Sequence, residues 1–114
     1  MKRGDIFAVV LTGDYGKPRP AIIIQSDRLG DDFESIIVCP LTSFDGPTPN
    51  FRFLLEPNTT NGLRARSQAM VEKPVTIPRR RVGQRIGRID DEHVEKLDRI
   101  LSFVMGLTDG PMTG

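Results

Sequence analysis

Helical periodicity appears only once in this chain, near its C-terminal end, and this constrains the fold more than any other feature. Residues 91–106 place apolar side chains at helical spacing, and Asp90 precedes them as an N-cap. Before them, short apolar stretches alternate with turns, because 11 glycines and 9 prolines interrupt a chain of 114 residues. The sequence therefore predicts a mainly β fold with one C-terminal α-helix, in which a twisted antiparallel sheet curls into a small barrel.

The expected strands are short and rich in β-branched residues. They cover residues 5–11, 21–25, 35–39, 51–56, 67–71, 75–77 and 84–89. Pro40 is expected to stop the third strand, and residues 12–20 and 42–50 are expected to be loops, since each holds two prolines. Pro78 is expected to open one helical turn over residues 79–82. A nucleotide-binding parallel sheet is not expected, because strands and helices do not alternate.

The length predicts one domain over residues 1–108, followed by a flexible tail over residues 109–114. Cys39 is the only cysteine, which excludes a disulfide framework and fits a reducing compartment. With His93 as the only histidine, the about four nitrogen or sulfur ligands of a structural zinc site are lacking, and no cofactor is expected. Apolar stretches are far shorter than the about 20 residues of a membrane span, so a cytoplasmic location is predicted.

Positive charge is concentrated in the middle of the chain. Residues 64–88 hold eight basic groups against one acidic group, a balance of +7. Residues 1–63 carry six basic and eight acidic groups, and residues 89–114 carry two basic and six acidic groups. The central basic block would attract a polyanion such as nucleic acid, and it is equally compatible with a solvated surface that has no partner.

Arg19 stands out because prolines fix the backbone on both sides of it. Pro18 and Pro20 flank this arginine directly before a buried strand, so that its guanidinium emerges from a stiffened position. An arginine held in this way can bind two phosphate oxygens at once, although an arginine on a surface turn has the same sequence. Thr42 and Ser43 place two hydroxyl groups at a strand end, where they can bind an anion or cap their own loop.

Taken together, four segments resemble the MazF/PemK family of toxin endoribonucleases. Residues 2–6, Lys-Arg-Gly-Asp-Ile, are similar to the opening strand of that family, and residues 19–27 resemble its Arg-Pro-Val-Val-Ile-Gln-Asn-Asp segment. Residues 38–43, Val-Cys-Pro-Leu-Thr-Ser, resemble its strand end Pro-x-Thr-Thr/Ser, and residues 89–107 resemble its C-terminal helix. The segments occur in the family's order over residues 2–108.

The resemblance implies a small SH3-like antiparallel barrel with a C-terminal helix, as in the MazF, PemK and CcdB toxins, and a homodimer. It implies the toxin of a type II toxin–antitoxin system that cleaves single-stranded RNA, mRNA in particular, at preferred sequences and without a metal. A 2′-hydroxyl would attack the adjacent phosphate and leave a 2′,3′-cyclic phosphate and a 5′-hydroxyl end. The catalytic residues carried over are Arg19, which would stabilise charge on the phosphorane, and Thr42, which would bind a phosphate oxygen.

Further residues are expected to contact RNA. They are Tyr15, Lys17, Pro20, Ser43, Phe44, Arg64, Arg66 and Gln68. Many family members carry Gly-Ser-Glu-Gln-x-Gly in the loop before the Arg-Pro pair. In this chain the loop is shorter, and residues 12–18 read Thr-Gly-Asp-Tyr-Gly-Lys-Pro. Some members place an acidic residue before the glutamine that matches Gln68, where this chain has Ser67. The general base is therefore open between Asp14, a neighbour on its loop, and Arg19 itself.

The resemblance also implies a cognate antitoxin, an acidic MazE-like peptide that would cover a groove walled by residues 64–88. Two other functions are weighed against an endoribonuclease. CcdB-like toxins that poison gyrase share the fold but end in Trp-Gly-Ile, whereas this chain has no tryptophan and ends Met-Thr-Gly. A non-enzymatic SH3-like binding module would present an aromatic groove, and this chain has one tyrosine.

Overall fold

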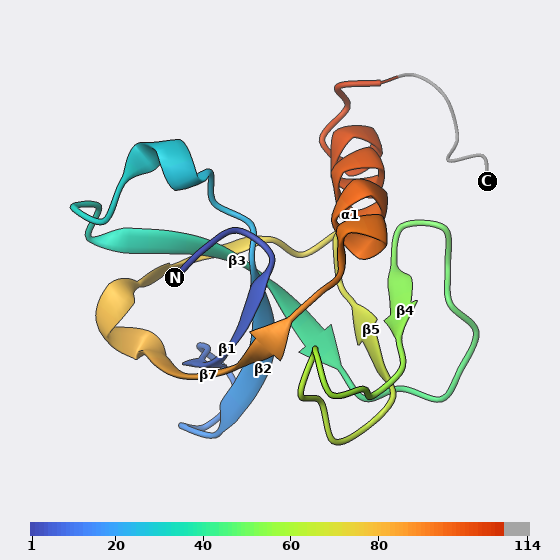
Figure 1. The fold of residues 1–114 in the computed structure, drawn as a ribbon, viewed down its shortest axis with the longest axis horizontal. Helices are drawn as coiled ribbons and strands as arrows, with labels where there is room; N and C mark the ends of the chain where they lie inside the picture. Colours follow the sequence, from blue (N-terminus) through green and yellow to red (C-terminus); the bar gives the residue numbers. More distant parts are fainter. Residues whose placement is uncertain (109–114) are drawn as a thin grey trace.

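An antiparallel sheet of seven strands makes up most of the molecule, of which the computed structural model describes residues 1–108 (Figure 1). The strands are β1 (Asp5–Val10), β2 (Pro18–Ile23), β3 (Ser35–Thr42), β4 (Phe53–Leu55), β5 (Ser67–Ala69), β6 (Val75–Pro78) and β7 (Val82–Arg88). Two 3₁₀ turns, η1 (Asp27–Leu29) and η2 (Arg79–Arg81), precede β3 and β7, and helix α1 (Asp91–Val104) follows β7. The expected mainly β fold with one C-terminal helix is confirmed.

Strand β3 gives the sheet its curl, because it changes partner along its length. Its first half pairs with β6, from Ser35 opposite Pro78 to Val38 opposite Val75. Its second half pairs with β5 through Leu41 and Thr42. The path through the sheet runs β4-β5-β3-β2-β1-β7, and every pairing is antiparallel. The two halves of the curled sheet therefore share β3 as their common strand.

Two proline positions differ from the sequence-based expectation. Pro40 was expected to end its strand, but β3 continues through it to Thr42. Pro40 lies where β3 leaves β6 and meets β5, and a missing N–H is tolerated where the pairing changes. Residues 18–20 were expected to be a loop but begin β2, which pairs with β1 alone over this stretch, since its pairing with β3 starts only at Ala21.

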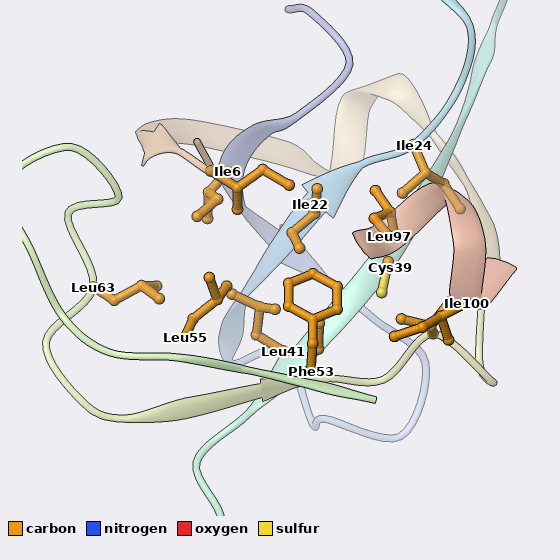
Figure 2. Packing of buried hydrophobic residues seen from close by; sticks show 13 residues of the cluster. Ile6, Ile22, Ile24, Cys39, Leu41, Phe53, Leu55, Leu63, Leu97 and Ile100 are labelled. Carbon is orange, nitrogen blue, oxygen red and sulfur yellow. The ribbon is translucent and has the colours of Figure 1, made fainter. Parts of the chain in front are cut away.

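The main core lies between the curled sheet and helix α1. Figure 2 shows side chains from β1, β2, β3, β4 and α1 pointing toward one another around the ring of Phe53. Leu97 and Ile100 are the buried residues of the helix, with Val94, Leu101 and Val104 packed beside them at the predicted spacing. A second cluster of Val9, Ala21, Ile23, Ile36, Val38 and Ile77 lies under the β3–β6 half.

Helix α1 begins where its sequence predicts and ends at Val104, two residues before the predicted end. The Asp90 side chain accepts a hydrogen bond from the His93 backbone N–H at 2.9 Å, which is the N-cap contact. Two residues beyond Val104, Gly106 adopts a φ of +75°, a left-handed conformation that commonly closes a helix. No helix within residues 1–108 is long and apolar enough to cross a membrane. The predicted tail at residues 109–114 lies outside the described residues.

Candidate functional site

Arg19 lies on the part of β2 that has a neighbouring strand on one side only. It is paired with Val9 of β1, and the prolines at positions 18 and 20 flank it within the strand. The edge that faces away from β1 is open at this point, because β3 joins only at Ala21. From this part of β2 the Arg19 side chain reaches the Leu41 carbonyl of β3.

Three contacts fix the Arg19 guanidinium. Its Nε donates to Asp14 Oδ2 at 2.9 Å, its Nη2 donates to Asp14 Oδ1 at 3.0 Å, and its Nη1 donates to the Leu41 carbonyl oxygen at 3.3 Å. A guanidinium has five N–H groups, so these three contacts leave two for a ligand. The Arg19 side chain keeps 32% of its surface exposed, which makes it accessible while it is held.

Thr42 and Ser43 lie beside this guanidinium because β3 ends there. The Leu41 carbonyl that accepts from Arg19 directly precedes Thr42 in the chain. Thr42 lines one groove with Arg19, and Ser43 is exposed and lines that groove and a second one. The structure thus brings the two predicted catalytic residues together from neighbouring strands.

The two grooves meet at Arg19. The larger has a volume of about 660 Å³, and its lining includes Arg19, Ser43 and Arg64. The smaller, of about 320 Å³, is lined by Asp14, Lys17 and Thr42 among others. The two grooves have four lining residues in common, which are Pro18, Arg19, Pro20 and Ser43. An extended chain lying across this surface would pass the guanidinium at the junction. Of the residues predicted to contact RNA, Pro20 lines both grooves and Lys17 lines the smaller one.

The far wall of the larger groove is the loop of residues 57–66, which packs tightly on β7. A side chain at Gly62 would place its Cβ 2.1 Å from the Ile86 carbonyl oxygen, and Gly62 has a φ of +65°. A side chain at Gly87 would place its Cβ 2.4 Å from the Asn61 carbonyl. The buried Asn61 side chain fastens the loop further by donating to the Glu56 carbonyl and accepting from the Asn58 and Leu63 backbone N–H groups.

Two aromatic rings stand exposed on the loops that flank Arg19. Tyr15 is 96% exposed and has a φ of +54° at the tip of the β1–β2 loop. Phe44 is 50% exposed on the loop that follows β3. Exposed rings of this kind present faces on which nucleic-acid bases stack. Both were predicted to contact RNA, and their positions agree with that expectation without testing it.

Gln68 was predicted to contact RNA directly, and the structure contradicts this. Its side chain is fully buried in β5 and its polar atoms are bonded to other protein groups. A side chain with no exposed surface cannot touch a ligand in the groove. The sequence identifies Gln68 only as a polar residue opening a strand, and it contains no local signal for the partners that bury it.

The 64–88 block contributes Arg64, Ala65, Ser67 and Ile86 to the wall of the larger groove, as the sequence predicts, but most of its basic residues lie elsewhere. Among its eight basic residues, Arg64 is the one that lines a groove beside Arg19. Arg66, predicted to contact RNA, pairs with Glu56 at 2.7 Å, and both side chains are more than half exposed. Arg85 and Arg88 face Asp5, while Arg79 donates to the Phe33 and Gly30 carbonyls. The basic residues are spread because they lie on the loop before β5, between β5 and β6, in η2 and in β7.

Cys39 and His93 are explained by the fold. Burial raises the pKa of the Cys39 thiol to about 12, with the Glu72 carboxylate adding to the shift, so the thiol is protonated at neutral pH. The His93 ring stacks on Phe53 with 5.6 Å between centroids and contacts Asp90 at 2.8 Å. Within residues 1–108, no three His, Cys, Asp or Glu side chains gather as a metal site.

Comparison with known proteins agrees with the fold. Residues 2–105 match the family described as PemK-like, MazF-like toxin of type II toxin-antitoxin system. The chain belongs to the PemK/MazF toxin family. The expected family is therefore confirmed by the length of chain that matches.

Relatives in the PemK/MazF family cover almost the whole chain. A probable endoribonuclease MazF from Mycolicibacterium smegmatis is 39% identical over 108 residues, which are 94% of this chain and 98% of that protein. The endoribonuclease EndoA of Bacillus subtilis is 25% identical over 114 residues, covering 96% and 97% of the two chains. A mycobacterial endoribonuclease solved with its cognate antitoxin has a TM-score of 0.80 at 15% identity and covers 96% of this chain and 99% of its own. At that identity the structural likeness shows the PemK/MazF fold.

Proposed function

We propose that this chain is the endoribonuclease toxin of a type II toxin–antitoxin system and that it cleaves single-stranded RNA, with mRNA as the main target, at preferred sequences. The observation that carries the proposal is Arg19, held at the junction of two grooves with two N–H groups left for a phosphate. The two most similar relatives described above are named endoribonucleases, which supports the same activity here.

The proposed reaction is transfer of a phosphoryl group within the RNA. The 2′-oxygen forms a bond to phosphorus, and the bond between phosphorus and the 5′-oxygen breaks, which gives a 2′,3′-cyclic phosphate and a 5′-hydroxyl end. Arg19 stabilises the charge that builds up on the phosphorane oxygens, where a preorganised donor contributes most. The Thr42 hydroxyl donates to one of the same oxygens.

Proton transfer is assigned to Asp14 and Arg19. Of the three alternatives for the general base, Asp14 is favoured because its carboxylate lies within 3.0 Å of the guanidinium and lines the same groove. Asp14 accepts the proton of the 2′-hydroxyl, and Arg19 donates a proton to the departing 5′-oxygen. Return of a proton from Asp14 to Arg19 across their hydrogen bonds restores both groups. The positive charge comes from Arg19, so the proposed reaction needs no divalent metal and no cofactor.

The test is a digest of a long RNA in EDTA, followed by mapping of the chemical ends. We expect 5′-hydroxyl and 2′,3′-cyclic phosphate ends at a small set of sequences, with no activity from Arg19→Ala and full activity from Arg80→Ala, an exposed arginine outside the groove. Activity that EDTA abolishes and a defined metal restores would contradict metal independence. Intact RNA together with inhibition of gyrase would favour the CcdB-like alternative.

Two partners belong to this proposal. A cognate antitoxin of acidic character would cover the grooves at Arg19, as a mycobacterial relative has been solved with its own antitoxin. A homodimer is the second, carried over from the family. Equilibrium ultracentrifugation of the toxin, alone and with the antitoxin, tests both.

A further inference from the structure

The Gln68 side chain lies inside the sheet and bonds to the loop that follows β3. We propose that Gln68 is a positioning residue that fixes residues 43–50 beside Thr42 and thereby sets the affinity for RNA. This inference rests on the proposed function for its RNA part, whereas the anchoring of the loop stands on contacts alone.

The Gln68 amide holds three acceptors on the loop. Its Nε2 lies 3.2 Å from the Gly46 carbonyl oxygen, 3.2 Å from the Pro47 carbonyl oxygen and 3.4 Å from Thr48 Oγ1. Three consecutive loop residues therefore converge on one buried nitrogen. A glutamate of the same size would present an oxygen where these acceptors need a donor.

The orientation of the amide is fixed from the opposite side by Arg52. Gln68 Oε1 accepts from Arg52 Nη1 at 3.3 Å, and an arginine can only donate, so the oxygen must face it. Arg52 is in turn held by Glu72, with Nε to Oε2 at 2.9 Å and Nη2 to Oε2 at 2.6 Å. The chain of contacts runs Glu72, Arg52, Gln68 and then the loop.

This chain of contacts is largely shielded from water. The Arg52 and Glu72 side chains are 17% and 21% exposed, and Gln68 has no exposed surface. Burial raises the pKa of Glu72, but the hydrogen bonds and charge of Arg52 outweigh it, so the net shift is downward and the carboxylate stays ionised at neutral pH. The described part of the chain has no buried side-chain N or O atom without a partner, so the network is complete.

The anchored segment begins at the junction of the two grooves. Ser43 lines both grooves at Arg19, and Phe44 is its exposed neighbour. The Phe44 ring lies against Gly46, where an added Cβ would come within 2.3 Å of it. Because the Gly46 carbonyl bonds to Gln68, holding that carbonyl also holds the surface against which the ring packs.

A fixed loop binds RNA better than a mobile one, for entropic reasons. Residues 43–50 contain no strand or helix, so their own backbone bonds do not order them. If a loop becomes ordered only when RNA binds, the entropy lost in ordering it lowers the affinity for RNA. The contacts of Gln68 impose the order in advance, and their loss should raise KM more than it lowers kcat.

The experiment uses the fact that the chain has no tryptophan. Phe44→Trp places one fluorophore on the loop, and its time-resolved anisotropy reports local motion without background. Gln68→Met is introduced into this variant and also into the unmodified chain, where RNA cleavage is measured. Gln84→Met on β7 is the matched control, because Gln84 is exposed and lines neither groove at Arg19.

We expect Gln68→Met to increase the fast component of the anisotropy decay and to raise KM about tenfold, the effect of losing one or two net hydrogen bonds. The kcat should change by less than about threefold, and Gln84→Met should change neither quantity. Unchanged loop motion, or increased motion with an unchanged KM, would overturn the proposal. If the parent protein neither binds nor cleaves RNA, the proposed function fails, while the anisotropy still decides the anchoring.

If Gln68→Met does not fold, Arg52→Lys provides a second test of the proposal. Arg52→Lys keeps a positive charge for Glu72 but removes the forked group that reaches Gln68 Oε1. We expect the same direction in both readouts, with an effect smaller than that of Gln68→Met. A folded Arg52→Lys variant with unaltered loop motion and KM would overturn the proposal equally.

Discussion

Asp14 and Arg19 form a two-point ion pair across the β1–β2 turn, with Oδ2 to Nε at 2.9 Å and Oδ1 to Nη2 at 3.0 Å. The pair sets the direction in which the guanidinium points, since an Arg–carboxylate fork fixes both planes. It also places the Asp14 carboxylate in the lining of the same groove as Arg19. Both properties follow from the five-residue separation that the turn spans.

Arg19→Ala should lower the rate of RNA cleavage by about 10²-fold or more, because it removes a charged two-point contact to the phosphate. Thr42→Ala should cost about fivefold, since one neutral hydrogen bond is involved and the Ser43 hydroxyl lies beside it. Single-turnover rates measured at saturating enzyme compare the two. A larger loss for Thr42→Ala than for Arg19→Ala would contradict the assignment.

Asp14→Asn should lower the cleavage rate by about 10²-fold, the usual contribution of a positioned base, while RNA binding changes little. The amide keeps the size of the side chain but accepts no proton. Asp32→Asn is the control, because Asp32 is an exposed acidic residue on the β2–β3 loop. The rate constant and the affinity for a 2′-O-methyl RNA separate the two effects. An unchanged rate would return the role of base to Arg19 or to another residue of the loop.

The cognate antitoxin should compete with RNA for the grooves at Arg19. Arg64→Glu should weaken both ligands together, because Arg64 lines the larger groove, whereas Arg66→Glu should do less, because Arg66 is paired with Glu56. Rising salt should weaken RNA binding more steeply than antitoxin binding, since apolar contacts are not screened. A titration with a fluorescent 2′-O-methyl RNA measures this. Simultaneous binding without loss of affinity would rule out a shared surface.

Acid should unfold the protein partly through Asp5. Burial raises the pKa of this carboxyl, but the Lys2 backbone N–H and the Arg85 and Arg88 guanidinium groups outweigh it, so the pKa lies below its ordinary value of 3.8. The stabilisation is therefore complete above that value and is lost as the pH falls through the lower folded-state pKa. Asp5→Asn should flatten the fall in urea midpoint between about pH 5 and pH 2. An equally steep fall in the variant would contradict this.

His93→Ala should leave RNA cleavage unchanged and reduce stability. The ring stacks on Phe53 at 5.6 Å and faces Asp90, on the side of the molecule occupied by α1. Losing an aromatic contact of this kind costs about 1 kcal/mol and a few degrees in Tm. Thermal unfolding and a cleavage assay on the same sample give both values. A large loss of activity in a well-folded variant would overturn the site assignment.

Helix α1 could be predicted in detail because its determinants are local. Asp90 caps a residue three positions away, and Leu97 and Ile100 are one turn apart on one face. The course of the strands at Pro20 and Pro40 could not be predicted in the same way. Whether a proline interrupts a strand depends on which neighbour needs its N–H, and that neighbour is far away in sequence.

In the candidate site, too, the residues with local determinants could be predicted and those with distant partners could not. Arg19 and Thr42 could be identified from their own surroundings in the chain and from the family resemblance. The burial of Gln68 depends on Arg52, which precedes β4, and on Glu72, which lies in the turn after β5. No sequence pattern links these two residues to Gln68. The ion pair of Arg66 with Glu56 could not be predicted either, because the two residues are ten positions apart in the sequence.

The packing of the 57–66 loop on β7 makes the width of the larger groove independent of the side chains that line it. Main chain meets main chain at Gly62 and Gly87, so the distance across the larger groove cannot be adjusted by exchanging side chains there. Arg64 and Ala65 on the same loop line the groove and are exposed, so they are under no such restriction. Point mutations at these two positions can therefore change the chemistry of the groove surface, while the width of the groove stays the same.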